Sequence, residues 1–378
     1  MATPPADLLI LGGGIIGLTT AYRLARAGLR VEVCDRGDFG QEASWAGAGI
    51  LPPGTPGHTA TAIDALRAYG SRFMPAFAEE LREATGIDNG YWRCGGIEVL
   101  RDEDRYAVDL WKEQRIAHEL LTPERLRELE PHLTALDGEA YLLPDCAQLR
   151  NPWHLKALVA ACRVQGVGLM PNMPVAEWVR DGERVVAVRF TNGEVRAASR
   201  FLVAAGAWSE ALLKPLGHAP GVHPVLGQIV LYRPRQLVLT RVLMMGKEYF
   251  VPRADGRVLA GSTEEPEAGF EKRTTVQAFE RLNAFACRVI PALADAVVEK
   301  QWAGLRPASA DGLPYLGAVP GTANVFVATG HYRAGVQLSL GSAVALEKWI
   351  LGEPAFLPPD DFRLDREPCH ENRPTFRS

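Results

Sequence analysis

The first apolar run of the chain is short, and a helical pattern follows it directly. Residues 8–11 are all Leu or Ile, as expected of a strand buried on both faces of a parallel sheet. Glycines occupy 12–14, and apolar residues then recur at helical spacing over 15–27, with Gly28 suited to end that helix. Residues 31–35 read as a second strand. This order predicts a βαβ unit at the start of the chain.

Two further buried strands are predicted much later in the chain. The apolar runs 201–204 and 325–328 each lead to a glycine, Gly206 and Gly330. A hairpin is predicted around Asn192-Gly193, because alternating segments flank that turn dipeptide. Strands that end at glycine in three distant places suggest one sheet built from discontinuous pieces.

These elements predict an α/β fold with a Rossmann-type nucleotide domain and an α+β second domain on a mainly antiparallel sheet. The nucleotide domain is expected to comprise residues 1–84, 148–222 and 305–366. The second, substrate-binding domain is expected to comprise residues 85–147 and 223–304. The polar residues 367–378 are expected to be a disordered tail.

Composition narrows the possible partners and location. The chain has 378 residues, 47% of them hydrophobic and 23% charged, with a net charge of −4, which indicates a globular protein and no nucleic-acid partner. The six cysteines form no C-x-x-C pair or zinc-like cluster, so we expect reduced thiols, no metal site and a cytoplasmic protein. The apolar run 8–18 is too short to span a bilayer, so no membrane association is expected.

The glycine turn carries the first chemical motif, Gly12-x-Gly14-x-x-Gly17. Such glycines permit a tight turn, approach of a pyrophosphate and close helix–strand packing, with Ile15 and Ile16 opening the helix. Asp35 ends the second strand near the offset expected of a ribose-binding carboxylate. The alternative is a glycine-rich turn without a ligand, but the strand, helix and acid together favour a dinucleotide.

The choice between NAD and FAD depends on the loop after Asp35-Arg36. Residues 37–50 are mostly small, which lets backbone approach a large planar ligand closely. An NAD domain would normally continue into another helix. This loop resembles the second FAD signature of the D-amino acid oxidase superfamily.

Four later segments resemble one branch of that superfamily, the glycine oxidases of the thiamine pathway. They are W-A-G-L-R-P at 302–307, D-G-L-P-Y-L-G at 311–317, G-H-Y-R-A-G at 330–335 and Y-F-V-P-R at 249–253. The resemblance extends from the first strand to about residue 366. Together these motifs are specific, although none would be so alone.

The resemblance implies a substrate site. It assigns the substrate carboxylate to Arg306, with Arg333 close by, and places Tyr249 in the cavity wall. A guanidinium suits this role because it binds a carboxylate through two hydrogen bonds. The ordinary alternatives are structural ion pairs for the arginines and a core position for the tyrosine. His331 is expected to contact the flavin rather than act as an acid or base, so no catalytic protein residue is assigned.

The expected cofactor is FAD, held without a covalent bond because no cysteine lies between Cys287 and Cys369. The residues expected to contact it are Gly12, Gly14, Ile15, Ile16, Gly17, Asp35, Arg36, Ala43, Ser44, Ala48, Gly49, Ile50, Val175, Gly206, Trp208, Gly330, His331, Tyr332, Arg333, Ala334, Gly335, Val336 and Gln337.

The implied reaction is oxidation of glycine, an N-substituted glycine or a small D-amino acid to an imine, which hydrolyses to glyoxylate and ammonia or an amine. O₂ would be reduced to H₂O₂. A D-amino acid dehydrogenase passing electrons to a quinone and a non-catalytic FAD-bearing subunit remain as alternatives. By resemblance the chain could form a homo-oligomer, a tetramer.

Three departures from the branch's pattern concern the substrate side. Leu226 stands where Lys or Arg is usual, and Lys247 and Glu264 introduce charges near the expected cavity. Lys247 and Glu264 either pair with each other at the surface or indicate a pocket mouth for a larger amine substituent. The second possibility would favour an N-substituted glycine.

Overall fold

The computed structural model describes residues 5–367, so the expected tail lies outside the described residues from 368 onward. The first βαβ unit forms as predicted from β1 (Ala6–Leu11), α1 (Ile15–Arg26) and β2 (Val31–Cys34). All of β1 except Asp7 is buried, which accounts for its continuous apolar run.

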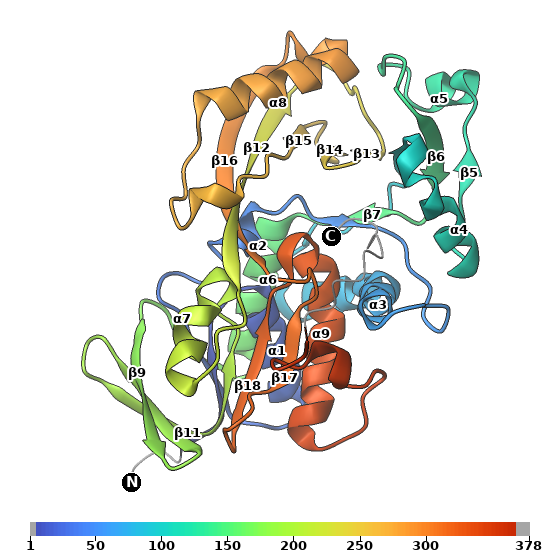
Figure 1. Ribbon diagram of the computed structural model, residues 1–378. Helices are drawn as coiled ribbons and strands as arrows, with labels where there is room; N and C mark the ends of the chain where they lie inside the picture. The colour runs from blue at the N-terminus through green and yellow to red at the C-terminus, as the bar shows by residue number, and fades with distance from the viewer. Residues whose placement is uncertain (1–4, 368–378) are drawn as a thin grey trace.

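The strands that end at glycine lie side by side in the first sheet, as predicted. Its order is β17-β18-β11-β1-β2-β8, and all of these neighbours are parallel except β17 with β18. The predicted hairpin at Asn192-Gly193 joins β10 to β11, and β9 extends it (Figure 1). The strands not yet bounded are β8 (Gly168–Met170), β9 (Val175–Asp181), β10 (Arg184–Phe190), β11 (Val195–Val203), β17 (Tyr315–Ala318) and β18 (Val325–Thr329).

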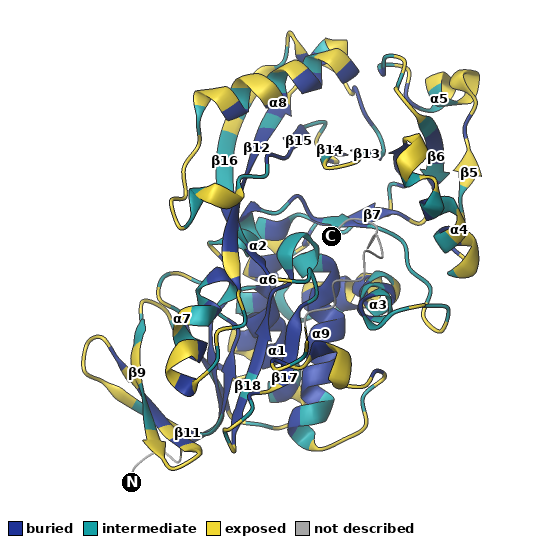
Figure 2. Cartoon of the chain, in the orientation of Figure 1, coloured by how far each residue is buried: buried dark blue, intermediate teal, exposed yellow. Residues whose placement is uncertain are grey.

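Helices cover this sheet and form the larger core with it. α9 packs against α1 and α3, and α6 packs against the same two helices. Figure 2 shows α1 and α9 largely in the colour of buried residues. Most of α9 is buried, which explains why it lacks the one-sided pattern of a surface helix. These helices are α3 (Ala62–Thr85), α6 (Asn151–Val164) and α9 (Gly335–Leu351).

The second sheet is mainly antiparallel, which confirms the predicted fold class. Its order is β16-β12-β15-β14-β13-β4-β6-β5, and only the β13–β4 pair is parallel among the described residues. Its strands are β4 (Gly96–Leu100), β5 (Glu119–Leu120), β6 (Glu139–Leu143), β12 (His223–Arg233), β13 (Val242–Met245), β14 (Glu248–Pro252), β15 (Val258–Gly261) and β16 (Val297–Ala308).

Three helices accompany the second sheet: α4 (Tyr106–Glu113), α5 (Pro123–Leu129) and α8 (Val276–Val289). α8 packs its apolar face on the sheet, where Phe285 stacks on Phe250 with ring centroids 4.8 Å apart. α5 begins at a capped turn, where the Thr122 hydroxyl accepts a hydrogen bond from the Arg125 amide and Pro123 takes the first helical position.

Two connections tie the sheets together. β12 and β16 pair along their whole length, from Arg233–Val297 to His223–Ala308, and extend from the second sheet toward the first (Figure 1). A short ribbon of β3 (Ile50–Leu51) and β7 (Ala147–Gln148) lies between the two sheets.

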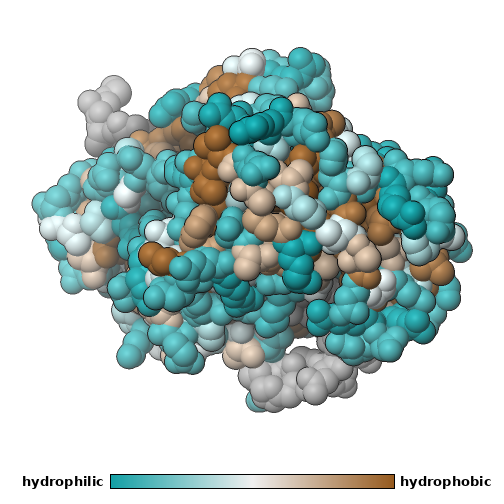
Figure 3. Space-filling view, turned by 90° about the horizontal axis from the view of Figure 1, so that it is seen from above, coloured by the Kyte–Doolittle hydropathy of each residue, from teal (hydrophilic) through white to brown (hydrophobic). Residues whose placement is uncertain are grey.

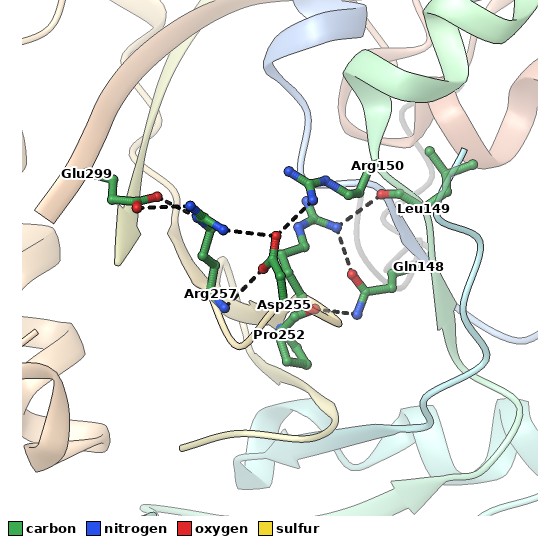
Figure 4. Close-up of polar contacts among 8 residues, drawn as sticks. Gln148, Leu149, Arg150, Pro252, Asp255, Arg257 and Glu299 are labelled. Carbon is green, nitrogen blue, oxygen red and sulfur yellow. Dashed lines mark hydrogen bonds and ion pairs between the residues drawn. The ribbon is translucent and has the colours of Figure 1, made fainter. Parts of the chain in front are cut away.

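Beside this ribbon, the turn after β14 is held by a chain of ion pairs. Asp255 contacts Arg150 at 3.0 Å and Arg257 at 3.1 Å, and Arg257 contacts Glu299 (Figure 4). The buried Arg253 donates to the Ala48 carbonyl at 2.9 Å and to Gln148 Oε1 at 2.7 Å. The second sheet is thereby tied to the ribbon and to the loop that precedes β3.

The face seen in Figure 3 is mostly hydrophilic at its edges, and apolar residues gather nearer its centre. Among the described residues, no helix has both the length and the apolar character needed to cross a membrane.

Candidate cofactor and substrate site

The glycine turn between β1 and α1 is packed too tightly for side chains at two positions. Gly12 has φ of 120°, and a Cβ there would lie 2.3 Å from the Ala204 carbonyl oxygen. A Cβ at Gly17 would lie 2.0 Å from the Gly12 oxygen. At Gly14 the nearest atom is Ser44 Oγ at 3.2 Å, so this position faces a more open space.

Asp35 is anchored at the end of β2 beside this turn. Its carboxylate accepts hydrogen bonds from the Gly13 amide at 2.7 Å and the Gly37 amide at 2.9 Å. Burial raises its pKa, although these two hydrogen bonds oppose the shift. The next residue, Arg36, lies over the Trp208 ring, with its guanidinium carbon 3.5 Å from the centroid.

The small-residue loop is fastened to the start of α1. In α2 (Ala43–Ala46), Ser44 Oγ accepts a hydrogen bond from the Ile15 amide at 2.9 Å. Asn151 Nδ2 donates to the Ser44 carbonyl at 2.7 Å, and Trp302 Nε1 donates to the Ala46 carbonyl at 3.0 Å. The residues of this loop are small because backbone atoms and the Asn151 side chain approach them closely.

A cavity of about 340 Å³ extends from the glycine turn to Arg306. Most residues expected to contact the cofactor line it: Gly12, Gly14, Ile15, Ile16, Asp35, Arg36, Ala43, Ser44, Val175, Gly206, Trp208, His331, Tyr332, Arg333, Gly335 and Val336. Gly17 packs beneath the turn, and a Cβ at Gly330 would point toward Ser309. Neither Gly17 nor Gly330 lines the cavity.

A second, smaller cavity of about 130 Å³ adjoins the first, and both are lined by Arg306, Arg333 and Val336. The remaining expected residues line this one: Ala48, Gly49, Ile50, Tyr249, Ala334 and Gln337. The three residues expected to bind substrate are thus brought together here. We call this smaller space the substrate cavity.

Arg306, on β16, is one of two arginines that line the substrate cavity. Its Nη2 donates to Ser262 Oγ at 2.7 Å and its Nη1 donates to the Thr263 carbonyl at 3.1 Å. Burial lowers its pKa, because the charged form loses hydration. Of the ion pairs formed within residues 5–367, none includes Arg306, and the carboxylate of Glu264 acts on its charge only from beyond ion-pair distance.

Tyr249 and Arg333 enter the cavity from different elements. Tyr249, on β14, packs its ring over Gly261, where a Cβ would lie 2.7 Å from the ring. Arg333 belongs to the short turn Tyr332–Ala334 after β18, and its Nη2 donates to the Lys247 carbonyl at 2.8 Å.

Lys247 and Glu264 pair with each other. Lys247 Nζ lies 2.6 Å from Glu264 Oε2, and the Tyr332 hydroxyl donates to the same carboxylate. Partial burial alone would raise the pKa of Glu264, but Lys247, Tyr332 and Arg333 outweigh it and lower the pKa. Lys247 keeps 72% of its side chain exposed, so the two residues form an ion pair at the surface instead of presenting two free charges.

His331 is buried, and its Nε2 lies 3.0 Å from Ser342 Oγ. Burial lowers its pKa to about 3. The ring is therefore neutral at ordinary pH and is no proton donor there, in keeping with the expectation that it has no acid–base role.

Sequence reasoning missed Ser262 and Thr263, which orient Arg306, and Gly227, which lies against the guanidinium. A Cβ at Gly227 would lie 2.2 Å from Arg306 Nη1. A glycine inside the apolar strand β12 was an available signal, because such a glycine often marks close approach of another group.

The described residues fit a dinucleotide with a planar ring system. At one end of the larger cavity, glycines without a Cβ atom and the amides at the start of α1 can accommodate phosphates. At the same end, Asp35 can bind a ribose hydroxyl. The cavity then continues to His331 and the cation Arg306 at the other end.

Comparison with known proteins defines the class. Residues 7–349 match the family described as DAO, FAD dependent oxidoreductase. The chain belongs to this family, and its cofactor is FAD.

The individual relatives are mainly glycine oxidases. The glycine oxidase of Pseudomonas aeruginosa is 38% identical over 353 residues, covering 93% of this chain and 96% of the relative. The crystal structure of glycine oxidase from Geobacillus kaustophilus matches with a TM-score of 0.89 and 30% identity, covering 97% and 100%. Iminodiacetate oxidase from Chelativorans sp. BNC1 matches with a TM-score of 0.83 and 27% identity, covering 94% and 98%.

Proposed function

We propose that this flavoprotein oxidises glycine, an N-substituted glycine or a small D-amino acid at the bond between the α-carbon and nitrogen. The observation that carries the proposal is Arg306, a partly buried guanidinium with no carboxylate within ion-pair distance among the described residues, in a cavity of only about 130 Å³. A small carboxylate substrate would supply the missing charge. The relatives named glycine oxidase support the same substrate class.

In this proposal Arg306 binds the substrate carboxylate through its planar guanidinium, while Ser262 and Thr263 fix its orientation. Tyr249 forms a side wall of the substrate cavity, and Arg333 adds positive charge from the turn that follows β18. When bound, FAD accepts a hydride equivalent from the substrate α-carbon and passes two electrons to O₂, which takes up two protons and becomes H₂O₂. The imine product then reacts with water to give ammonia or an amine and a 2-oxo acid, which is glyoxylate when the substrate is glycine or an N-substituted glycine.

We assign no general base to the protein. His331 is neutral but bonded to Ser342 and buried, and Glu264 is engaged by Lys247 and Tyr332. The contribution of the chain is therefore to hold the carboxylate and direct the α-carbon toward the large cavity.

For FAD we propose that Gly12, Gly14 and the first amides of α1 receive the pyrophosphate, and that Asp35 binds a ribose hydroxyl. Attachment is proposed to be non-covalent, since Cys287 is the last cysteine before the C-terminal flavin loop. The sheet of β1 is proposed to mark the FAD-binding domain, residues 1–84, 148–222 and 305–366. The sheet of β12 is proposed to mark the substrate domain, residues 85–147 and 223–304. Its strand β16 crosses the limit between the two domains, and Arg306 lies just beyond that limit.

The direct test is anaerobic mixing of the purified yellow protein with glycine, sarcosine and D-alanine while flavin absorbance near 450 nm is followed. Bleaching by glycine or sarcosine, and steady H₂O₂ release in air, are the expected results. Bleaching without reoxidation by O₂ would indicate a dehydrogenase that uses another acceptor. A flavin that no amino acid bleaches would indicate a non-catalytic subunit. Light scattering would check the expected homo-oligomer.

A further inference from the structure

Glu264 contacts residues around the two cavities but lines neither the larger one, which we call the FAD cavity, nor the substrate cavity. Its carboxylate accepts a hydrogen bond from the hydroxyl of Tyr332, and Tyr332 lines the FAD cavity. The same carboxylate pairs with Lys247 Nζ at 2.6 Å. Any effect of Glu264 on a bound substrate therefore has to act through other residues.

These contacts belong to a closed ring of interactions. Arg333 follows Tyr332 directly in the chain, and its Nη2 donates to the Lys247 carbonyl at 2.8 Å. The ring thus passes from Tyr332 to Glu264, then to the Lys247 side chain, and from the Lys247 carbonyl back to Arg333. Because Arg333 and Ala334 line the substrate cavity, the ring holds part of the wall of that cavity.

The Glu264 side of the ring is fixed by the backbone of the second sheet. The amides of Thr263 and Glu265, on either side of Glu264, donate to carbonyls of β12 at 3.2 Å and 2.9 Å. Arg306 Nη1 donates to the Thr263 carbonyl at 3.1 Å, so the same short segment also orients Arg306. The two arginines of the substrate cavity are therefore both connected to residues 262–264.

The Tyr332 side of the ring is a turn that depends on its contacts. Tyr332 has φ of 43°, in the left-handed region that residues other than glycine rarely adopt, and such a conformation persists only where surrounding groups hold it. Burial and the hydrogen bond with Glu264 raise the pKa of Tyr332 to about 12, so its hydroxyl stays protonated and donates. Burial opposes the lowered pKa of Glu264, but Lys247 and Tyr332 outweigh it and keep the carboxylate ionised.

We propose that Glu264 is a positioning residue for substrate binding, which holds the turn Tyr332–Ala334 against the second sheet and thereby fixes the Arg333 guanidinium in the wall of the substrate cavity. Arg306 and Arg333 then attract one substrate carboxylate from two different elements. This inference rests on the proposed function, because it assumes that a substrate carboxylate binds in that cavity.

A positioning role and a role through charge alone predict opposite changes. The negative charge of Glu264 weakens the attraction of the two arginines for a carboxylate, so a role through charge predicts tighter binding once that charge is removed. Glu264→Gln removes the charge but keeps an oxygen that can accept from Tyr332, whereas Glu264→Ala removes both. A positioning role predicts weaker binding in Glu264→Ala and not in Glu264→Gln.

The first test is titration of each FAD-loaded variant with glycolate, a small carboxylate without an amine, followed through the flavin spectrum. Glu264→Ala should bind glycolate about tenfold more weakly than the parent, as expected for loss of a hydrogen bond to a charged group. Glu264→Gln should stay within about threefold of the parent, because an ion pair with the exposed Lys247 contributes little.

The second test is anaerobic flavin reduction by glycine. In Glu264→Ala the glycine concentration for half-maximal reduction should rise by about tenfold while the limiting rate changes little, because the variant removes a group that acts on binding and not on the α-carbon.

Two further variants connect the effect to the ring. Tyr332→Phe removes the same hydrogen bond from its other end, and it tests that bond even if Glu264→Ala fails to hold FAD. It should weaken glycolate binding by a similar factor, and the double variant should bind no more weakly than either single variant. Glu267→Ala removes a carboxylate from the exposed turn Pro266–Ala268, outside both cavity linings, and should leave the affinity as it is.

The outcomes separate this inference from the proposed function. Tighter glycolate binding in both Glu264→Gln and Glu264→Ala would overturn the inference in favour of a role through charge. Unchanged affinity in Glu264→Ala, even with a lower Tm, would overturn it in favour of a purely structural contact, and so would full additivity of Glu264→Ala with Tyr332→Phe. If the parent protein neither binds glycolate nor is reduced by any glycine derivative or small D-amino acid, the proposed function falls and this inference falls with it.

Discussion

Gly227→Ala adds one methyl group beside Arg306 and changes no charge. Gly227 lies on β12, two residues from Val225, which is paired with Arg306 across β12 and β16. The added Cβ would lie 2.2 Å from Arg306 Nη1 and 2.3 Å from its guanidinium carbon. Carbon contacts are favourable near 3.5–4.0 Å, so the guanidinium has to move by about 1 Å.

The cost should appear in substrate binding and not in folding. The atoms in the way are the far end of a flexible side chain, and Gly227 has no positive φ that would exclude alanine. The shift would carry the guanidinium away from Ser262 Oγ and the Thr263 carbonyl, which now orient it. A misplacement of about 1 Å in a substrate-positioning group lowers kcat/KM by about 100-fold, equivalent to about 2.7 kcal/mol.

Two measurements on the FAD-loaded Gly227→Ala protein check this: anaerobic flavin reduction by glycine, and titration with glycolate followed through the flavin spectrum. Both kcat/KM and the affinity for glycolate should fall, while FAD content and Tm stay close to those of the parent. Gly168→Ala is the matched control, because it adds a methyl group to strand β8 against the Glu32 side chain, away from both cavities. Unchanged kcat/KM and glycolate affinity in Gly227→Ala would refute the role of Arg306 as the carboxylate clamp.

Three other predictions use simpler readouts. Arg306→Ala should lower kcat/KM, with a loss of about 2–5 kcal/mol in the free energy of transition-state binding. Arg306→Lys should recover little of this loss, because an ammonium group lacks the planar fork of a guanidinium. Near-normal kcat/KM in both variants would exclude Arg306 as the group that binds the substrate carboxylate. Gly14→Val and Asp35→Ala should purify with less FAD, judged by the ratio of absorbance at 450 and 280 nm, and full flavin content in Gly14→Val would contradict the pyrophosphate site. Burial lowers the pKa of His331 to about 3 and that of His154 to about 4, so the folded chain resists protonation that the unfolded chain accepts below pH 6.5. Urea unfolding should therefore show a stability loss of about 2 kcal/mol per histidine at pH 5 relative to pH 7.5, and a flat profile would contradict neutral buried rings.

The cofactor half of the molecule could be predicted because its signals are local. Gly12 and Gly17 are required by backbone contacts within the first turn, and the apolar run before them is buried as a whole. The distant strands β11 and β18 were recognisable for the same reason, since each is a short apolar run that stops at a glycine. Their adjacency in one parallel sheet then followed from the topology that such strands usually adopt.

The substrate half could be predicted only in part, because its contacts depend on register between distant segments. Arg306 was identified through a motif, but its partners Ser262 and Thr263 lie about 40 residues earlier and meet it only in the folded sheet. Lys247 and Glu264 were open to two interpretations for the same reason. Their spacing in the sequence does not reveal that the fold brings their charged groups within 2.6 Å of each other.

This difference bears on where substrate preference is encoded. One end of the FAD cavity is built from the glycine turn and the first residues of α1, so single side-chain changes there mostly affect whether the cofactor fits. The substrate cavity instead borders the second sheet at Tyr249, and Tyr249, Met244 and Glu98 form a row across that sheet with one residue per strand. Each position in that row can change its side chain without altering the hydrogen bonds of the sheet. Relatives named for glycine and for iminodiacetate share this fold with the present chain, so we expect their substrates to be separated by such rows more than by the flavin site.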